Sequence, residues 1–330
     1  MRVFIENHSV MREQLDKKEA HSLYFEVAPN VWGTKDIFVN MYIVRNPEDN
    51  TWVLIDAGLK SSAPKIKKMV EELFGPNSRP EAILLTHGHF DHTGSLQKLA
   101  EEWKVEVYAH YLELPYLSGK SSYPPPDSTV GGGLMASAAW MYPTKPINIE
   151  SHLNVLPPDG TVPFLPGWVY LHTPGHAPGH VSFFRQRDKV LIAGDAVVTT
   201  KQESAMSVMM QTKTLSGPPK YFTYDWEAAG NSVRNIADLR PRIIASGHGK
   251  PMSGREMDTQ LTNLSAHFKQ LAVPHHGRYV NDPAVTDANG VRYVPPEEKT
   301  NKKVLIAGIA IAAIAISLIV IGFKSANKQA

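Results

Sequence analysis

The sequence predicts an α/β fold, in which short buried strands alternate with amphipathic helices. Short apolar runs recur along the chain between segments whose apolar residues have helical spacing. A length of 330 residues suits one large domain of this class, or a pair of smaller ones. Clusters rich in histidine directly follow several predicted strands, which is where the sheets of α/β proteins gather their ligand sites.

The first half of the chain shows this alternation clearly. Residues 38–45 alternate apolar and polar side chains in the manner of a half-buried strand. A helix is expected over residues 62–73, because Pro64 suits its first turn and Gly75 its end. A second helix is expected over 94–103, and further strands over 51–56, 82–86 and 105–109.

The second half of the chain continues the same pattern. Asp225 is a suitable N-cap for one helix, and apolar residues at helical spacing from Met257 to Leu271 predict another. A strand, the two arms of a hairpin and a last strand are expected, in that order, over 168–172, 180–185, 189–193 and 242–245.

Two segments stand outside this alternation. Residues 118–150 have no long period, and a loop of this length in a compact domain is usually functional. We expect this candidate lid loop to move at its glycines, 131–133, and to cover a cleft with apolar side chains that bind the substrate: Leu134, Met135, Trp140, Met141 and Tyr142. Residues 274–303, rich in Pro, Asn and Asp, are expected to form a strap or linker.

The last part of the chain predicts a single-pass membrane anchor. Residues 304–323 carry no charge, and twenty helical residues span about 30 Å, the thickness of a bilayer's hydrocarbon core. Four Lys or Arg residues precede this transmembrane helix and two follow it, and no signal peptide is recognisable. The catalytic domain, residues 1–273, is therefore expected in the cytoplasm, with a short tail at 324–330. Small residues on one face of the helix suit a homodimer: Gly308, Ala312 and Ala315.

Composition excludes several classes of function. Hydrophobic residues make up 42% and charged residues 20% of the chain, which is ordinary for a globular protein. A formal net charge of +2 gives no reason to expect a nucleic-acid partner. The chain has no cysteine, which excludes disulfides, iron–sulfur clusters, a Cys nucleophile and any thiolate metal ligand. The 14 histidines remain the main candidates for chemistry.

The turn after the strand at 82–86 reads THGHFDHTG and contains three histidines and an aspartate. In an extended segment, residues two apart point the same way, so His87 and His89 can reach one metal ion. Asp91 and His92, which follow, can reach a second ion a few ångströms away. Because burying four such side chains without a cation is costly, this cluster predicts a metal site.

Three more clusters follow predicted strands. HTPGHAPGH begins at His172 and contains His176 and His180, LIAGDA places Asp195 at the end of a strand, and ASGHGKP does the same for His248. The carboxyl ends of these strands are expected to bring the clusters together.

The ordered motifs HxHxDH, TPGH, GDA and GHG resemble those of the metallo-β-lactamase superfamily over about residues 25–270. The resemblance implies an αββα sandwich with a dinuclear metal site at one edge. It assigns one ion to His87, His89 and His176, the other to Asp91, His92 and His248, and the bridging position to Asp195. It also implies that Asp56, in LIDAG, orients a ligand and that His180 shapes its loop, whereas His172 matches no ligand position.

The resemblance implies a hydrolase that acts on an ester, lactone, thioester or amide of a small substrate. Two divalent ions lower the pKa of a shared water, and the resulting hydroxide attacks the carbonyl. Asp91 is expected to orient this hydroxide and pass a proton to the leaving group, which makes it the candidate catalytic residue. The expected cofactor is two divalent ions: Zn²⁺, with Mn²⁺ or Fe²⁺ as alternatives.

The branches of the superfamily fit the sequence unequally. Lactamases that need a Cys ligand are excluded, and the basic glutathione-binding residues of glyoxalase II-type thioesterases have no clear counterpart. Acyl-homoserine-lactone lactonases carry a Tyr shortly after the bridging Asp, whereas AVVTTK follows Asp195 here and Tyr221 and Tyr224 come later. The alternative to a hydrolase is a mononuclear iron oxygenase similar to persulfide dioxygenases, which the number of bound metal ions would distinguish.

Overall fold

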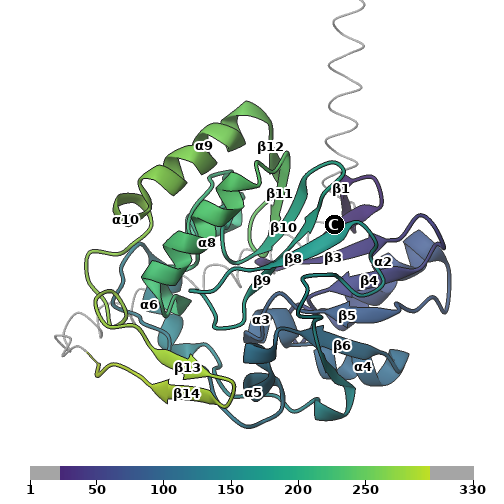
Figure 1. Cartoon of the computed structure of the whole chain (residues 1–330), viewed down its shortest axis with the longest axis horizontal. Helices are drawn as coiled ribbons and strands as arrows, with labels where there is room; N and C mark the ends of the chain where they lie inside the picture. Colours follow the sequence, from purple (N-terminus) through teal and green to yellow (C-terminus); the bar gives the residue numbers. More distant parts are fainter. Residues whose placement is uncertain (1–22, 298–330) are drawn as a thin grey trace, which may run out of the picture.

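Two β-sheets stacked face to face form the centre of the protein, as the computed structural model in Figure 1 shows for the described residues, 23–297. The first sheet has seven strands in chain order, the first three pairs antiparallel and the rest parallel. They are β1 (Phe25–Ala28), β2 (Val31–Asp36), β3 (Val39–Arg45), β4 (Trp52–Ile55), β5 (Ala82–Leu84), β6 (Glu106–Ala109) and β7 (Leu153–Val155).

The second sheet has five strands in the order β12-β11-β10-β9-β8, in which only β10 and β11 are parallel neighbours. Its strands are β8 (Trp168–His172), β9 (Val181–Arg185), β10 (Val190–Gly194), β11 (Ile243–Ser246) and β12 (Met252–Ser253). The predicted hairpin, 180–185 with 189–193, corresponds to β9 and β10.

Helices cover the outer face of each sheet. The longer ones are α2 (Ala63–Phe74) and α4 (Leu96–Trp103) on the first sheet, and α8 (Trp226–Asp238) and α9 (Gly254–Ala266) on the second, where the one-turn α10 (Phe268–Leu271) also packs. Shorter α-helices are α3 (Phe90–Thr93), α5 (Leu114–Leu117), α6 (Leu134–Ser137) and α7 (Ala205–Met210). Single 3₁₀ turns are η1 (Tyr111–Glu113), η2 (Ala139–Met141), η3 (Glu150–His152) and η4 (Lys220–Phe222).

Three apolar clusters hold these layers together by removing apolar surface from water. Between the sheets, Tyr42 and Ile55 pack with Phe183 and Ile192. A second cluster joins the first sheet to α2 and α4, and a third joins the second sheet to α8, α9 and α10. The predicted α/β fold is therefore confirmed, and the layers follow the order helix, sheet, sheet, helix.

Two parallel strand pairs set the position of the polar clusters. The pair β4 and β5 lies in one sheet, and the pair β10 and β11 lies in the other. Asp56 follows β4, His87 lies just after β5, Asp195 follows β10, and His248 comes two residues after β11. One edge of the sandwich thus gathers polar side chains from both sheets.

The loop at 118–150 and the segment from 274 to 297 pack against each other. The backbone N–H of Arg278 donates to Asp127 at 2.6 Å, and the Tyr279 hydroxyl donates to the carbonyl of Pro125 at 2.6 Å. Part of the predicted strap forms a hairpin of β13 (Val285–Asp287) and β14 (Gly290–Tyr293), drawn in yellow in Figure 1. This segment is therefore a packed cover of the loop.

The predicted membrane anchor needs correction. Its span, residues 304–323, lies outside the described residues, and no helix within 23–297 is long and apolar enough to cross a bilayer. The longest described helices, α8 and α9, have 13 residues each, or about 20 Å, and each buries only one face. The described residues therefore give no support to the expected transmembrane helix, and the expectation of a membrane localisation is withdrawn.

Candidate metal centre

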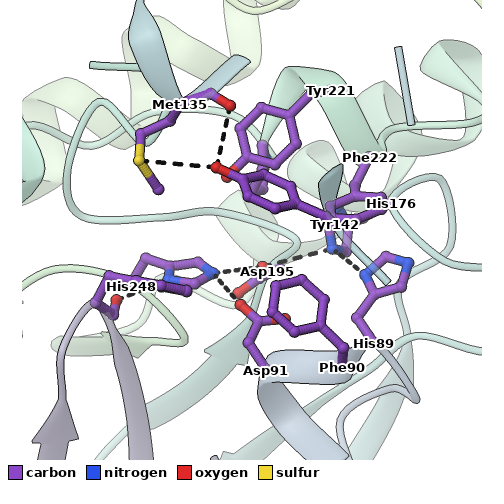
Figure 2. Close-up of a pocket in the computed structure, with 12 residues that line it drawn as sticks. His89, Phe90, Asp91, Met135, Tyr142, His176, Asp195, Tyr221, Phe222 and His248 are labelled. Atoms are coloured by element: carbon purple, nitrogen blue, oxygen red, sulfur yellow. Dashed lines mark hydrogen bonds and ion pairs between the residues drawn. The ribbon is translucent and has the colours of Figure 1, made fainter. Parts of the chain in front are cut away.

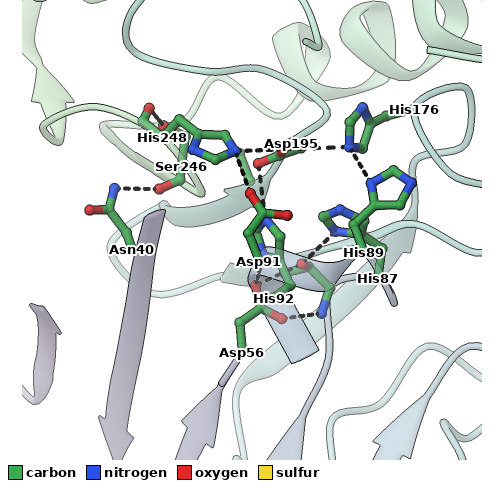
Figure 3. A network of polar contacts seen from close by, with 12 residues as sticks. Asn40, Asp56, His87, His89, Asp91, His92, His176, Asp195, Ser246 and His248 are labelled. Carbon is green, nitrogen blue, oxygen red and sulfur yellow. Dashed lines mark hydrogen bonds and ion pairs between the residues drawn. The ribbon is translucent and has the colours of Figure 1, made fainter. Parts of the chain in front are cut away.

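Seven of the predicted site residues meet at the shared edge of the two sheets (Figure 3). They come from four separate segments of the chain, and all are buried, with Asp91 the most exposed at 7%. The seven are His87, His89, Asp91, His92, His176, Asp195 and His248.

These side chains form three overlapping groups that could each hold a metal ion. In every group the ligand atoms lie within 4.8 Å of one another. His89 Nδ1 lies 3.0 Å from His176 Nε2, and His248 Nε2 lies 3.5 Å from Asp91 Oδ2. The groups are His87, His89 and His176; Asp91, His92 and His248; and His87, His92 and Asp195.

Asp195 lies between the two outer groups. Its Oδ2 is 3.0 Å from His248 Nε2 and 3.4 Å from His176 Nε2, and its Oδ1 is 3.6 Å from His92 Nε2. One carboxylate therefore contacts imidazoles of both groups, which is the placement that a bridging ligand needs. Gly247 permits this approach, because a Cβ atom there would lie 2.1 Å from Asp195 Oδ1.

The HGHFDH segment changes conformation after its second histidine. His89 has the extended backbone that we expected, with a φ of −64° and a ψ of 155°, and its ring centroid lies 4.6 Å from that of His87. Asp91 and His92 belong to the one-turn helix α3. Gly94, which follows α3, packs so closely on a neighbouring loop that a Cβ atom would lie 2.3 Å from the Lys60 nitrogen. The short helix brings Asp91 Oδ2 to 3.5 Å from His248 Nε2, while the ring centroid of His92 lies 4.2 Å from that of His87.

Hydrogen bonds behind the centre fix which ring nitrogen of each histidine faces it. His92 Nδ1 bonds Asp56 at 2.8 Å, and His248 Nδ1 bonds the carbonyl of Phe38 at 2.8 Å. His89 Nε2 lies 3.4 Å from the Tyr224 hydroxyl. Because Asp56 and the Phe38 carbonyl can only accept, the opposite nitrogens of His92 and His248 are left with lone pairs directed at the centre.

Asp56 and His180 occupy the supporting positions that the sequence predicts. Asp56 has a φ of 61°, and it accepts hydrogen bonds from the N–H and hydroxyl of Thr86 at 2.8 and 2.7 Å. His180 Nε2 accepts from the backbone N–H of Asp195 at 2.8 Å, and its Nδ1 contacts the Thr173 hydroxyl at 2.8 Å. Both ring nitrogens of His180 are thus engaged outside the ligand groups.

His172 lies away from the centre, as expected from its lack of a matching ligand position. Its ring stacks on that of His110, with centroids 4.2 Å apart and planes at 14°. Its Nε2 also bonds the carbonyl of Pro178 at 2.8 Å. Burial lowers the pKa of His110 to about 4, so this stacked ring is neutral at pH 7.

Glu113 is a buried residue that our sequence analysis missed. Its Oε2 accepts from the backbone N–H of Gly88 at 2.8 Å and from the Tyr123 hydroxyl, and its Oε1 accepts from the N–H of Gly179 at 2.7 Å. Gly88 separates His87 from His89, and Gly179 precedes His180. One carboxylate therefore ties together the HGH and PGH loops. The sequence offers only a weak signal, an acidic residue within the apolar run YLELPYL.

Electrostatics keep most of the histidines neutral. Burial lowers the pKa of His87 and His89 well below the usual value and that of His176 to about 3. At His248, burial is outweighed by the neighbouring Asp195, which raises the pKa of the imidazole. Although burial opposes ionisation of Asp195, His248 and His92 hold the pKa of its carboxyl well below its usual range. Neutral imidazole and ionised carboxylate are the forms that bind metal ions.

The donor set fits divalent metal ions. His87 Nε2, His92 Nε2 and Asp195 Oδ1 are buried without a hydrogen-bond partner, and leaving such atoms unpaired is costly. Cations bound at these atoms would satisfy them. Imidazole nitrogens with carboxylate oxygens suit Zn²⁺, Mn²⁺ and Fe²⁺.

A narrow cleft leads to the centre (Figure 2). Met135 and Tyr142 of the 118–150 loop line it, as predicted. Trp140 and Met141 do not, because 54% and 46% of their surfaces are exposed to solvent outside the cleft, and Leu134 is also absent from the lining. The expectation that all five side chains cover the centre therefore holds for two of them.

The sequence profile of the Metallo-beta-lactamase superfamily matches residues 34–248, well over half of the chain. The chain belongs to the metallo-β-lactamase superfamily. The resemblance found in the motifs is thus confirmed. Among solved structures, BJP-1, a subclass B3 metallo-β-lactamase of Bradyrhizobium japonicum, shares this fold with a TM-score of 0.50 and 18% identity, over 76% of this chain and 93% of that chain.

Two curated superfamily relatives have names that indicate hydrolases. "Probable metallo-hydrolase YflN" of Bacillus subtilis is 44% identical over 248 residues, which cover 75% of this chain and 94% of that protein. "Hydroxyacylglutathione hydrolase GloC" of Haemophilus influenzae is 29% identical over 158 residues, which cover 48% of this chain and 66% of that protein. Together with the His and Asp groups, these relatives support a metal-dependent hydrolase that uses divalent ions.

Proposed function

We propose that this superfamily member is a dinuclear hydrolase, which cleaves an ester, lactone, thioester or amide of a small substrate. The observation that carries the proposal is the position of Asp195, whose two oxygens lie 3.0–3.6 Å from histidines of both outer groups. In this proposal Asp195 bridges two ions, one held by His87, His89 and His176 and the other by Asp91, His92 and His248.

Two divalent ions at such a site polarise a carbonyl and lower the pKa of a nearby water. The chain's own residues then position the reactants and move the proton. Asp91 would accept a proton from the attacking water at its carboxylate and return it to the leaving-group atom. Asp56 would keep His92 in one orientation throughout.

Metal analysis of the purified full-length protein tests this proposal. We expect about two transition-metal ions per chain, and hydrolysis of at least one class in a panel of lactones, thioesters, aryl esters and β-lactams. The double variant His87→Ala with His89→Ala should lose activity and most of the bound metal. His276→Ala is the control, because this histidine is exposed and outside the ligand groups.

Three results would contradict the proposal. Full metal content and turnover in the double variant would show that the site is assigned wrongly. One iron per chain with oxygen consumption would favour a mononuclear oxygenase. The absence of bound metal from a folded, inactive protein would exclude both enzymes.

A further inference from the structure

The lining of the cleft divides into two chemical kinds. Five polar side chains, His89, Asp91, His176, Asp195 and His248, belong to the candidate metal centre. Every other lining residue is aromatic or apolar, and within the described residues no Lys or Arg lines the cleft. These others are Phe38, Phe90, Met135, Tyr142, Pro219, Tyr221 and Phe222.

The rings of Phe90, Phe222 and His89 form an aromatic wall from the cleft to the centre, and the ring of Tyr142 packs against this wall. The ring of Phe90 lies 5.7 Å from that of Tyr142, which lies 5.9 Å from Phe222 with planes at 30°. Phe222 in turn stacks on His89 at 4.6 Å with planes at 29°. A substrate group that reaches His89 therefore passes along aromatic faces.

The roof of the cleft, formed by Met135 and Tyr142, is also apolar in character. The Tyr142 hydroxyl donates to the carbonyl of Met135 at 3.1 Å, so this polar atom is already paired within the roof. The backbone N–H of Met135 donates to the carbonyl of Glu203 at 3.1 Å, which attaches the roof to the neighbouring segment. Figure 2 shows Met135 and Tyr142 above Asp91 and Asp195.

The cleft is nearly closed in this conformation. Its free volume is about 10 Å³, room for roughly one water molecule. A substrate is larger than this space, so lining side chains must shift to admit it. A group enclosed by these side chains beside the reacting carbonyl loses its water.

We propose that the site accepts uncharged substrates whose acyl portion is apolar and lies between the aromatic wall and the roof. This inference rests on the hydrolase proposed above and names its substrate class. An acyl group with a carboxylate end would be desolvated in a cleft without a lysine or arginine to pair it, which is costly. An alkyl or aryl acyl group would instead bury apolar surface against Phe90, Tyr142 and Phe222.

Matched 4-nitrophenyl esters test this inference with the metal-loaded full-length protein. The hexanoate and the adipate monoester differ only in a terminal methyl or carboxylate, and the acetate lacks the chain. After correction for alkaline hydrolysis rates, kcat/KM for hexanoate should exceed that for acetate about tenfold, the effect of burying roughly two methylenes. The adipate monoester should react at least tenfold more slowly than the hexanoate.

Variants of the roof locate this preference. Tyr142→Ala and, independently, Met135→Ala should each lower the hexanoate-to-acetate ratio at least threefold with unchanged metal content. Trp140→Ala is the control in the same loop, because its side chain is exposed and outside the cleft lining. It should leave the ratio unchanged.

The outcomes separate the substrate class from the hydrolase itself. A metal-loaded enzyme that hydrolyses the adipate monoester as fast as the hexanoate overturns the inference and leaves the hydrolase standing. An equal fall of the hexanoate-to-acetate ratio in Trp140→Ala and in the roof variants also overturns the inference and leaves the hydrolase standing. A metal-loaded protein that cleaves none of the three esters also overturns the inference, and a protein that binds no metal overturns the proposed function with it.

Discussion

Glu113→Gln tests whether one buried carboxylate holds two histidine-bearing loops together. Glu113 is fully buried and accepts three hydrogen bonds, from Gly88, Gly179 and Tyr123. A glutamine amide has one oxygen, so its NH₂ group must face at least one of these donors. The substitution therefore removes one or more of the bonds and leaves a donor unpaired.

The magnitude follows from these contacts. A hydrogen bond to a charged group contributes about 1.5–3 kcal/mol, and a stranded buried N–H costs about 1–3 kcal/mol. Removing the buried charge offsets part of this loss. We expect the free energy of unfolding to fall by about 2–4 kcal/mol. Because Gly88 and Gly179 adjoin His87, His89 and His180, we also expect weaker metal binding.

Urea unfolding of the chelator-treated protein, with a competition assay for metal affinity, measures both effects. The control is Glu150→Gln, which removes an ion pair with Lys120 in which both side chains are 63% exposed, and should change stability by less than about 1 kcal/mol. If Glu113→Gln is as stable as the wild type and binds metal equally well, the carboxylate does not join the loops and the reasoning fails.

Three further predictions concern single contacts. Asparagine at position 56 tolerates the positive φ of 61°, but Asp56→Asn removes the charged partner of His92, so metal affinity should fall about 10–100-fold. The control is Asp49→Asn at an exposed position, and unchanged metal affinity in Asp56→Asn would exclude an orienting role. Gly247→Ala would place a Cβ atom 2.1 Å from Asp195 Oδ1, and equilibrium dialysis should show impaired metal binding; full occupancy would contradict the predicted clash. The folded-state pKa of His110, about 4, lies below its ordinary 6.5, so its contribution to stability is present above pH 6.5 and is lost as pH falls toward 4. The metal-free His110→Phe variant should therefore lose less stability than the wild type between these pH values, and identical pH profiles would refute this linkage.

Most of the architecture could be predicted because local patterns determine it. The apolar runs that became β3, β4, β5, β9, β10 and β11 lie within two residues of their predicted positions. In contrast, β1, β2 and β7 were not predicted. Residues 31–36 read VWGTKD, and their glycine and two charged residues interrupt the apolar alternation that would predict a strand. Strand β7 has only three residues, too few to show a pattern. Tertiary pairing, rather than local sequence, makes these segments strands.

The histidine and aspartate clusters could be found from sequence because strand ends place them at one edge. Their detailed conformation could not. Helix α3 is only four residues long, too short to show a helical period, yet it determines where Asp91 and His92 lie in the centre. Glu113 escaped detection because it contacts Gly179, which is 66 residues away in the chain.

The loop at 118–150 shows a further limit. Its composition indicated a binding loop, but Trp140 and Tyr142 are equally aromatic and only two residues apart. The structure places Tyr142 in the cleft and leaves Trp140 exposed. Packing against Phe90 and Phe222 decides between them, and both of these residues come from other parts of the fold.

Anomalous diffraction from crystals of the zinc-loaded full-length protein locates the bound ions. We expect two zinc peaks, one among His87, His89 and His176 and the other among Asp91, His92 and His248, with Asp195 between them. A single fully occupied peak, or zinc bound away from these residues in a folded protein, would contradict a dinuclear centre at this edge of the sandwich.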